Sequence, residues 1–396
     1  MNTAIDRNFD GKLSVENRYD YLNLNTCRFI WQQVKFPSVT DASNTTTRIL
    51  KQGEVQGSDV AAHGVGVVDI KTSILPEADA LFLTVIDKYG YELWRWTFPV
   101  DKLNRETEQF SASSGRASYT ETEKGITVKA NGRTFVFSKK DGQLKDVSVN
   151  NRKISFANGP RFIGARRADR SLDQFYNHDD EKAKAKDRTY SEFTDAAVFT
   201  KLDVKEEGNL ILTANYKLGN LDKAQWTIHP DGMATLDYTY NFSGVVDLMG
   251  ICFDYPEEQV LSKRWLGAGP YRVWQNRIHG TQYDIWENDY NDPIPGETFT
   301  YPEFKGYFGS VSWMSIRTKE GTISLTNETP DSYIGVYQPR DGRDRLLYTL
   351  PESGISVLNV IPPVRNKVNS TDLCGPSSQP KWVDGSQTGR LVIRFE

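Results

Sequence analysis

Apolar and polar side chains alternate along residues 13–98, and clusters of Gly, Pro, Asp and Asn interrupt the alternation at short intervals. A period of two is typical of strands that bury one face. The alternating runs are LSVENRYDYLNL from Leu13, CRFIWQQV from Cys27, GVGVVDIK from Gly64, and ALFLTVID with ELWRWTF, which are joined through a turn at 88–90. This pattern predicts an all-β first unit over residues 1–112, of a size that suits an immunoglobulin-like sandwich.

A second alternating region follows the small polar stretch SASSGRAS at 111–118, whose composition is that of a linker. Beyond it, GITVKA and RTFVFS flank the hairpin signal Asn131-Gly132, and KAQWTIH and MATLDYTYNF flank the turn signal Pro230-Asp231-Gly232. No helical period is sustained over about ten residues anywhere in the chain. The sequence therefore predicts a second, larger all-β domain over residues 117–396.

The charge balance excludes two classes of partner. The net charge is −4 and both signs are spread along the 396 residues, so the chain carries neither a basic footprint for nucleic acid nor a polybasic membrane patch. No apolar run approaches the roughly 20 residues that span a bilayer, and the first residues contain no apolar signal region. We expect a chain that is soluble and, as written, unexported. The polar lead before Leu13 is typical of a point where a longer protein has been cut, so a periplasmic or extracellular parent whose signal lies outside this chain stays open.

Cysteine and histidine give no sign of a cofactor or metal. Cys27, Cys252 and Cys374 are an odd and scattered set, which predicts buried free thiols rather than a disulfide framework or a metal motif. The histidines lack the partners three or four residues away that a zinc site needs. They are His63, His178, His229 and His279.

Residues 265–286, WLGAGPYRVWQNRIHGTQYDIW, are too aromatic and too polar for ordinary core. The order Trp-Leu-Gly-x-Gly-Pro from Trp265, then Arg277, then Asp284-x-Trp286 resembles the signature of the C-terminal β-sandwich of glycoside hydrolase family 2 β-galactosidases. The tryptophans either stack on sugar or anchor a loop. Arg277 and Asp284 form the polar pair of this stretch, and they either brace it or contact sugar hydroxyls.

Two further stretches resemble the same family, in the same order along the chain. Val15-x-Asn17-x-Tyr19-x-Tyr21 is similar to the start of the family's second immunoglobulin-like domain. The run from Phe135 through Asp141-Gly142 to Gly159-Pro160-Arg161 is similar to the opening of its large C-terminal sandwich. The resemblance implies an immunoglobulin-like β-sandwich followed by a large galactose-mutarotase-like β-supersandwich. The chain departs from the family pattern around residues 160–190 and 300–310.

The resemblance also implies that the catalytic residues lie elsewhere. A retaining glycosidase needs two carboxyl groups about 5–5.5 Å apart, and family 2 enzymes place both on a (β/α)8 barrel. This chain has no βαβα alternation that would build one. Its tempting pair, Asn327-Glu328, stands between alternating stretches and is predicted to end a hairpin. We therefore expect no catalytic residue in this chain. The resemblance implies that the chain braces the barrel of the parent enzyme, lines the rim of its substrate site and contacts carbohydrate. A homo-oligomer is compatible with this role.

The loop at residues 367–380 stands where lactose-cleaving relatives place an Asp-Asp-Ser-Trp turn that sends a tryptophan into the active site. The residues here are Thr371-Asp372-Leu373-Cys374, so the stacking tryptophan is missing. Either Trp382 takes its place, or the aglycone site differs from that of the relatives. The substrate-binding candidates implied by the resemblance are Asp372, Leu373, Cys374, Arg277, Asp284 and Trp286. The alternative function is a free-standing carbohydrate-binding module, which the reading frame upstream of Leu13 would distinguish.

Overall fold

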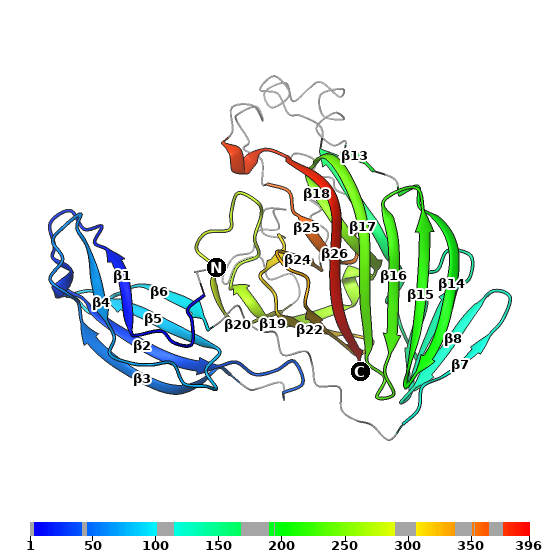
Figure 1. Cartoon of the computed structure of the whole chain (residues 1–396), viewed down its shortest axis with the longest axis horizontal. Helices are drawn as coiled ribbons and strands as arrows, with labels where there is room; N and C mark the ends of the chain where they lie inside the picture. Colours follow the sequence, from blue (N-terminus) through cyan, green and yellow to red (C-terminus); the bar gives the residue numbers. More distant parts are fainter. Residues whose placement is uncertain are drawn as a thin grey trace. The chain divides into compact units, whose positions relative to one another are not determined.

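The computed structural model describes residues 4–41, 46–100, 115–167, 190–193, 195–289, 306–336, 351, 353–363 and 375–396. They belong to two compact units (Figure 1), which are Met1–Thr107 with Gln282–Ile285, and Glu108–Thr281 with Trp286–Glu396. The described residues form strands and short 3-10 turns without an α-helix, so the all-β prediction is confirmed. No described helix is long and apolar enough to cross a membrane. The predicted domain boundary falls mostly outside the described residues and stays a prediction.

The first unit contains two antiparallel sheets. The smaller pairs β1 (Lys12–Glu16) with β4 (Val65–Asp69), and the larger has the order β3-β2-β5-β6. Its strands are β2 (Arg28–Lys35), β3 (Arg48–Gln56), β5 (Ala80–Ile86) and β6 (Glu92–Pro99). Alternate residues of β2, such as Phe29 and Trp31, are buried with Leu83 and Val85 of β5. The strands predicted from residues 27, 64, 80 and 92 are confirmed.

The strand predicted across residues 13–24 is wrong in its second half. β1 ends at Glu16, and the next element is the 3-10 turn η1 (Leu24–Thr26). Asn17, only 1% exposed, donates through Nδ2 to the carbonyl oxygens of Leu22 and Val60 and accepts from the backbone N–H of Tyr19. These bonds occupy backbone groups that a strand would use, and they turn the chain. The alternation continues through Tyr19 because its side chain still packs on the core.

The second unit contains a sheet of eleven strands with the order β21-β24-β25-β18-β12-β10-β9-β8-β7, to which β11 and β13 are added at β10 and β12. Its strands are β7 (Ser118–Glu121), β8 (Gly125–Ala130), β9 (Arg133–Ser138), β10 (Leu144–Val149), β11 (Arg152–Ile154), β12 (Ala157–Arg167), β13 (Tyr190–Glu192), β18 (Leu248–Asp254), β21 (Phe308–Gly309), β24 (Tyr333–Gly335) and β25 (Ile355–Val360). Every named pair in it is antiparallel, as in the first unit.

A nine-stranded sheet has the order β14-β15-β16-β17-β26-β23-β22-β19-β20. Its strands are β14 (Val198–Glu207), β15 (Asn209–Lys217), β16 (Leu221–Ile228), β17 (Ala234–Val246), β19 (Val260–Gly269), β20 (Gln282–Asp289), β22 (Trp313–Thr318), β23 (Thr322–Asn327) and β26 (Lys381–Phe395). The 3-10 turns η2 (Glu257–Gln259) and η5 (Pro376–Ser378) precede β19 and β26.

Aromatic side chains join the two large sheets into one core. The ring of Phe137 on β9 lies with its edge toward Trp226 on β16, with the centroids 5.8 Å apart. The ring of Phe156, between β11 and β12, has its centroid 4.5 Å from that of Phe253 on β18 and 5.3 Å from that of Phe395 on β26 in the other sheet. Burial of each such ring contributes about 1.5–3 kcal/mol relative to exposure. The second unit is therefore a large sandwich of two packed sheets.

The turn signals in the sequence are confirmed at both predicted hairpins. Asn131 and Gly132 join β8 to β9 with φ of 43° and 75°, the left-handed values that a two-residue hairpin turn requires. Between β16 and β17, the backbone N–H of His229 donates to the carbonyl of Met233, and the N–H of Gly232 donates to the carbonyl of His229.

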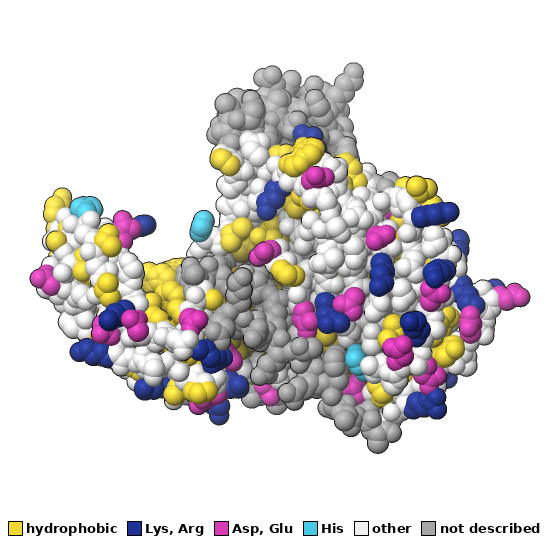
Figure 2. Space-filling model, viewed as in Figure 1, with side chains coloured by type: hydrophobic (Ala, Val, Ile, Leu, Met, Phe, Trp, Pro, Cys, Tyr) yellow, Lys and Arg dark blue, Asp and Glu magenta, His cyan; other side chains and the backbone are white. Residues whose placement is uncertain are grey.

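Charges of both signs alternate along the exposed edge strand β14. Lys201, Asp203, Lys205 and Glu206 lie on this strand, and Figure 2 shows positive and negative side chains mixed over this side of the second unit. A charged edge resists pairing with the edge of another sheet. The strand therefore ends the sheet without offering a template for aggregation.

Candidate functional site

Trp265 braces the aromatic stretch from inside the core. It lies on β19 with 0% of its surface exposed, and its indole Nε1 donates to the carbonyl of Ala268 at 3.0 Å. Its ring meets Phe308 edge to face, with the centroids 4.8 Å apart. An indole in this position holds the end of β19 and offers no face to a ligand.

Trp286 explains the glycines of the motif. This partly buried residue on β20 donates through Nε1 to the carbonyl of Gly267 at 3.1 Å. A Cβ atom added to Gly269 would lie 2.4 Å from Cδ1 of the same indole. Glycine is required there because the ring packs directly on the backbone. With Trp274 buried against Tyr307, the described geometry favours the loop-anchoring interpretation of the stretch.

Arg277 and Asp284 do not form the polar pair that the sequence suggests. Asp284, in the segment that groups with the first unit, accepts from Arg95 Nη2 at 2.8 Å and from Thr47 Oγ1 at 2.7 Å. Its side chain is 14% exposed, so the ion pair is largely shielded from water. Arg277 belongs to the second unit and has an exposed side chain, and its backbone N–H donates to the carbonyl of Trp274 at 2.8 Å. The short separation of Arg277 and Asp284 in sequence is no guide to pairing here, because Arg95 and Thr47, which are distant in sequence, bind the Asp284 carboxylate.

The other substrate-binding candidates divide into described and undescribed residues. Asp372, Leu373 and Cys374 lie outside the described residues. Trp382, at the start of β26, is 69% exposed and presents its indole to the surface.

Asn327-Glu328 lies at a turn, as expected of a hairpin end. β23 ends at Asn327, which is 1% exposed and donates through Nδ2 to Ser332 Oγ at 2.9 Å. Its Oδ1 accepts from the backbone N–H of Thr329 at 3.1 Å. These bonds give Asn327 a structural role in holding the turn.

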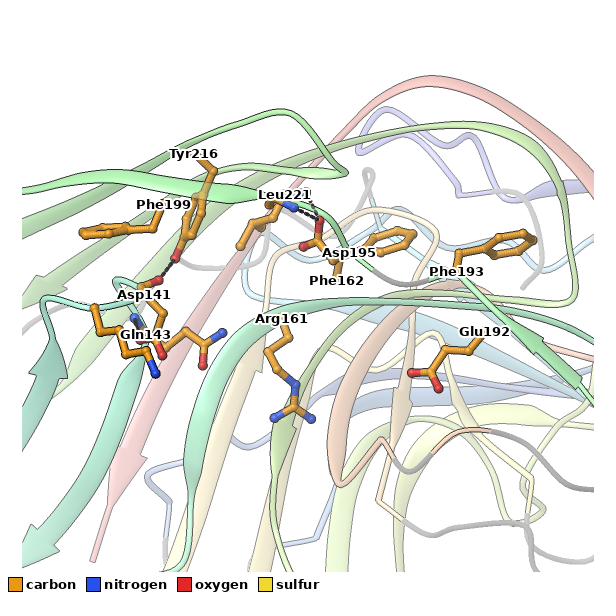
Figure 3. Close-up of a pocket in the computed structure, with 12 residues that line it drawn as sticks. Asp141, Gln143, Arg161, Phe162, Glu192, Phe193, Asp195, Phe199, Tyr216 and Leu221 are labelled. Carbon is orange, nitrogen blue, oxygen red and sulfur yellow. Dashed lines mark hydrogen bonds between the residues drawn. The ribbon is translucent and has the colours of Figure 1, made fainter.

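A cavity of about 350 Å³ is lined by residues of both large sheets, in a place that the sequence does not indicate. β12 is joined to β10 by the single pair Leu144↔Gly159, and β13 pairs only with Ala165, Arg166 and Arg167. Between these pairings no described strand pairs with this edge of β12, where the backbone N–H of Phe193 donates to the carbonyl of Gly164 at 2.8 Å. We call this stretch the open edge of β12, and the cavity lies beside it. The turn after β9 and residues of β14, β15 and β16 complete the lining. In Figure 3 the aromatic rings lie above and Gln143, Arg161 and Glu192 lie below.

Hydrogen bonds fix the upper wall of the cavity. The hydroxyl of Tyr216 donates to the carbonyl of Asp141 at 2.9 Å (Figure 3), and burial raises the pKa of this tyrosine, with Asp141 adding to the shift. Asp195 Oδ1 accepts from the backbone N–H groups of Ala197 and Asn220 at 3.0 and 2.9 Å. The ring of Phe199 packs over Gly142, where an added Cβ would lie 2.7 Å from it. These contacts hold the side chains of Tyr216, Asp195 and Phe199 in the upper wall.

Charges at the lower wall are mostly paired. Arg161 Nη1 lies 2.7 Å from Asp254 Oδ1, and burial opposes its charge, but Cys252 and Asp254 outweigh that effect and raise its pKa. Burial likewise raises the pKa of Cys252 to about 11, which keeps the thiol protonated and unreactive. Among the described residues, no partner is found for the carboxylate of Glu192, which is exposed.

Gln143 is held with one polar atom unused. Lys145 Nζ donates to Gln143 Oε1 at 2.8 Å and also pairs with Asp141 at 2.8 Å. This bond fixes the orientation of the amide and leaves Nε2 as a donor in the cavity lining (Figure 3). No described residue accepts a hydrogen bond from this Nε2. Gln143 and Arg161 fall in a motif that the sequence singles out, but no spacing rule connects them to Glu192 or Phe199.

Comparisons with known proteins give the family. The family model of the beta galactosidase small chain matches residues 129–358, more than half of this chain, so the chain belongs to this family. A search of curated proteins gives no match.

Solved structures similar to the chain include two sugar epimerases or their homologues. Galactose 1-epimerase from Lactobacillus acidophilus NCFM is 8% identical with a TM-score of 0.39, and the match covers 72% of this chain and 99% of that chain. The GalM/aldose epimerase homologue from C. elegans is 9% identical with a TM-score of 0.34, covering 67% of this chain and 96% of that chain.

Proposed function

We propose that this chain is the non-catalytic C-terminal part of a family 2 retaining glycoside hydrolase that cleaves terminal β-D-galactosides. The observation that carries the proposal is the match to the β-galactosidase small chain over residues 129–358, which includes strands of both large sheets. In this role the chain braces a catalytic (β/α)8 barrel and lines its substrate rim. The immunoglobulin-like class of the first unit belongs to the same proposal, which its two antiparallel sheets support.

Assays of aryl β-galactoside hydrolysis test the proposal. The purified chain should show no turnover, because binding surface alone does not replace two positioned carboxylates. Adding the parent enzyme's barrel, either on the same polypeptide or as a separate chain, should give hydrolysis. Glu328→Gln should leave that activity in place. Turnover by the chain alone that survives Glu328→Gln but is lost on replacing another of its carboxylates would refute the non-catalytic role.

The rim is proposed to include Asp372, Leu373 and Cys374. An aliphatic side chain stacks on a sugar more weakly than an indole does, so Leu373→Trp in the complete enzyme should lower KM for disaccharides and change KM little for aryl galactosides. Ser378→Trp, at the end of η5, serves as a matched control in the neighbouring turn. An unchanged KM for both substrates with an intact fold would remove Leu373 from the rim.

The alternative is a free-standing carbohydrate-binding module. The exposed indole of Trp382 favours it, because accessible aromatic faces are used to stack on sugars. Sequencing the reading frame on the 5′ side distinguishes the two: a barrel with an Asn-Glu strand end supports the enzyme part, and an unrelated upstream frame supports the module.

A further inference from the structure

We infer that the cavity beside the open edge of β12 is a binding site for a small neutral saccharide. The inference goes beyond the proposed function, in which sugar contact is confined to the loop at residues 367–380, and it does not depend on a catalytic barrel. Its volume of about 350 Å³ lies at the lower end of the roughly 300–1,000 Å³ found for small-ligand pockets. A monosaccharide or short disaccharide fits that size better than a polymer.

The lining combines two kinds of surface that sugars need. Phe193 and Phe199 are partly buried and line the cavity, so part of each ring is available to the apolar C–H face of a pyranose. Across from them in Figure 3 lie the Gln143 amide and the Glu192 carboxylate. Hydroxyl groups both donate and accept, so a carboxylate acceptor and an amide donor suit two of them at once.

The charges of the cavity argue against an ion as its ligand. The guanidinium of Arg161 is paired with Asp254 at 2.7 Å and Lys145 is paired with Asp141 at 2.8 Å, so these cations are already neutralised. Lys140 and Glu192 are exposed residues of the lining that carry opposite charges. No group of three or more His, Cys, Asp or Glu suited to a metal is found in the described part of the chain. The balance favours a neutral ligand.

The site is also preorganised. Asp195 is held by backbone N–H groups, Gln143 by Lys145, and Tyr216 by the carbonyl of Asp141. A ligand that enters would order few side chains, and preorganisation of this kind preserves affinity that ordering would otherwise reduce. The lining comes from both large sheets, with Arg161 and Glu192 on the eleven-stranded sheet and Phe199 and Tyr216 on the nine-stranded sheet.

Titration of the full chain with methyl β-D-galactopyranoside and with lactose, followed by calorimetry and saturation-transfer NMR, tests the inference. We expect saturable binding of at least one of them. Glu192→Gln should weaken it roughly five- to tenfold, because a charge-assisted hydrogen bond becomes a neutral one. Glu207→Gln removes an exposed carboxylate at the far end of β14 and should leave binding unchanged. Thermal unfolding of both variants confirms that each is folded.

Three outcomes would overturn the inference. The first is no binding of either sugar at tens of millimolar. The second is binding that Glu192→Gln leaves untouched and Trp382→Ala abolishes, which would place the site on the exposed indole of β26. The third is saturable binding of sulfate or calcium that displaces the sugar. Absence of binding together with hydrolysis by the barrel-supplied enzyme would refute this site and leave the proposed function standing.

Discussion

Replacing Trp265 with alanine should destabilise the second unit by about 3–5 kcal/mol. The indole is fully buried, so its removal forfeits the transfer free energy of a large ring and leaves a cavity beside Phe308. The carbonyl of Ala268 also loses its donor, which places the loss toward the upper end of that range. With a slope of about 2–3 kcal/mol per molar urea, the midpoint should fall by roughly 1–2 M.

Urea unfolding followed by far-ultraviolet circular dichroism measures this loss without relying on the fluorescence of the replaced indole. Trp382→Ala is the control, because that side chain is 69% exposed and its loss should change stability by no more than about 0.5 kcal/mol. Trp265→Phe keeps a ring but not the donor and should fall between the two. Equal midpoints for Trp265→Ala and the unmutated chain would show that the indole is not part of the core, and the loop-anchoring interpretation would fail.

Three further predictions follow from other contacts. Burial lowers the pKa of His229 below 6.5, so the unfolded chain binds a proton more readily than the folded chain does. The contribution of His229 to the free energy of unfolding should therefore be complete above about pH 6.5 and fall below it. His229→Gln should reduce the pH dependence of the urea midpoint between about pH 7.5 and 5.5. Asp284→Asn weakens the pair with Arg95 and should cost the first unit about 1.5–3 kcal/mol, whereas Asp59→Asn, on an exposed side chain, should cost less by the same urea assay. Elastase should cut first within residues 111–118 and leave two β-rich fragments, and a chain that resists until it unfolds as a whole would contradict the predicted boundary.

The strands could be predicted from the sequence where one face is buried and the other exposed. β2 and β15 show this alternation, so a period of two locates them. β18 is buried on both faces almost throughout, and its run LMGICFD carries no period to recognise. β3 is an edge strand rich in charged and polar residues, and its sequence does not indicate a strand either.

The candidate site was less accessible to sequence reasoning, because partners distant along the chain decide it. The family resemblance singled out the aromatic stretch, but the Asp284 partner is Arg95, which lies 189 residues away. Asn17 fits a strand pattern and yet ends one, because its amide finds carbonyl groups that no local rule reveals. The cavity lies where the pairings of β12 with β10 and with β13 leave a gap between them. Strand register determines that gap, and composition does not reveal it.

The position of β26 has a consequence for synthesis on the ribosome. This strand runs beside β17 (Figure 1), with which it pairs from Ala234↔Ile393 to Val246↔Lys381. On its other side it pairs with β23 from Ile323↔Phe395 to Asn327↔Leu391. Until it emerges, the edges of β17 and β23 that pair with it have no partner strand in the nascent chain. Such edges invite pairing with other nascent chains, so this unit should need a holding chaperone during translation.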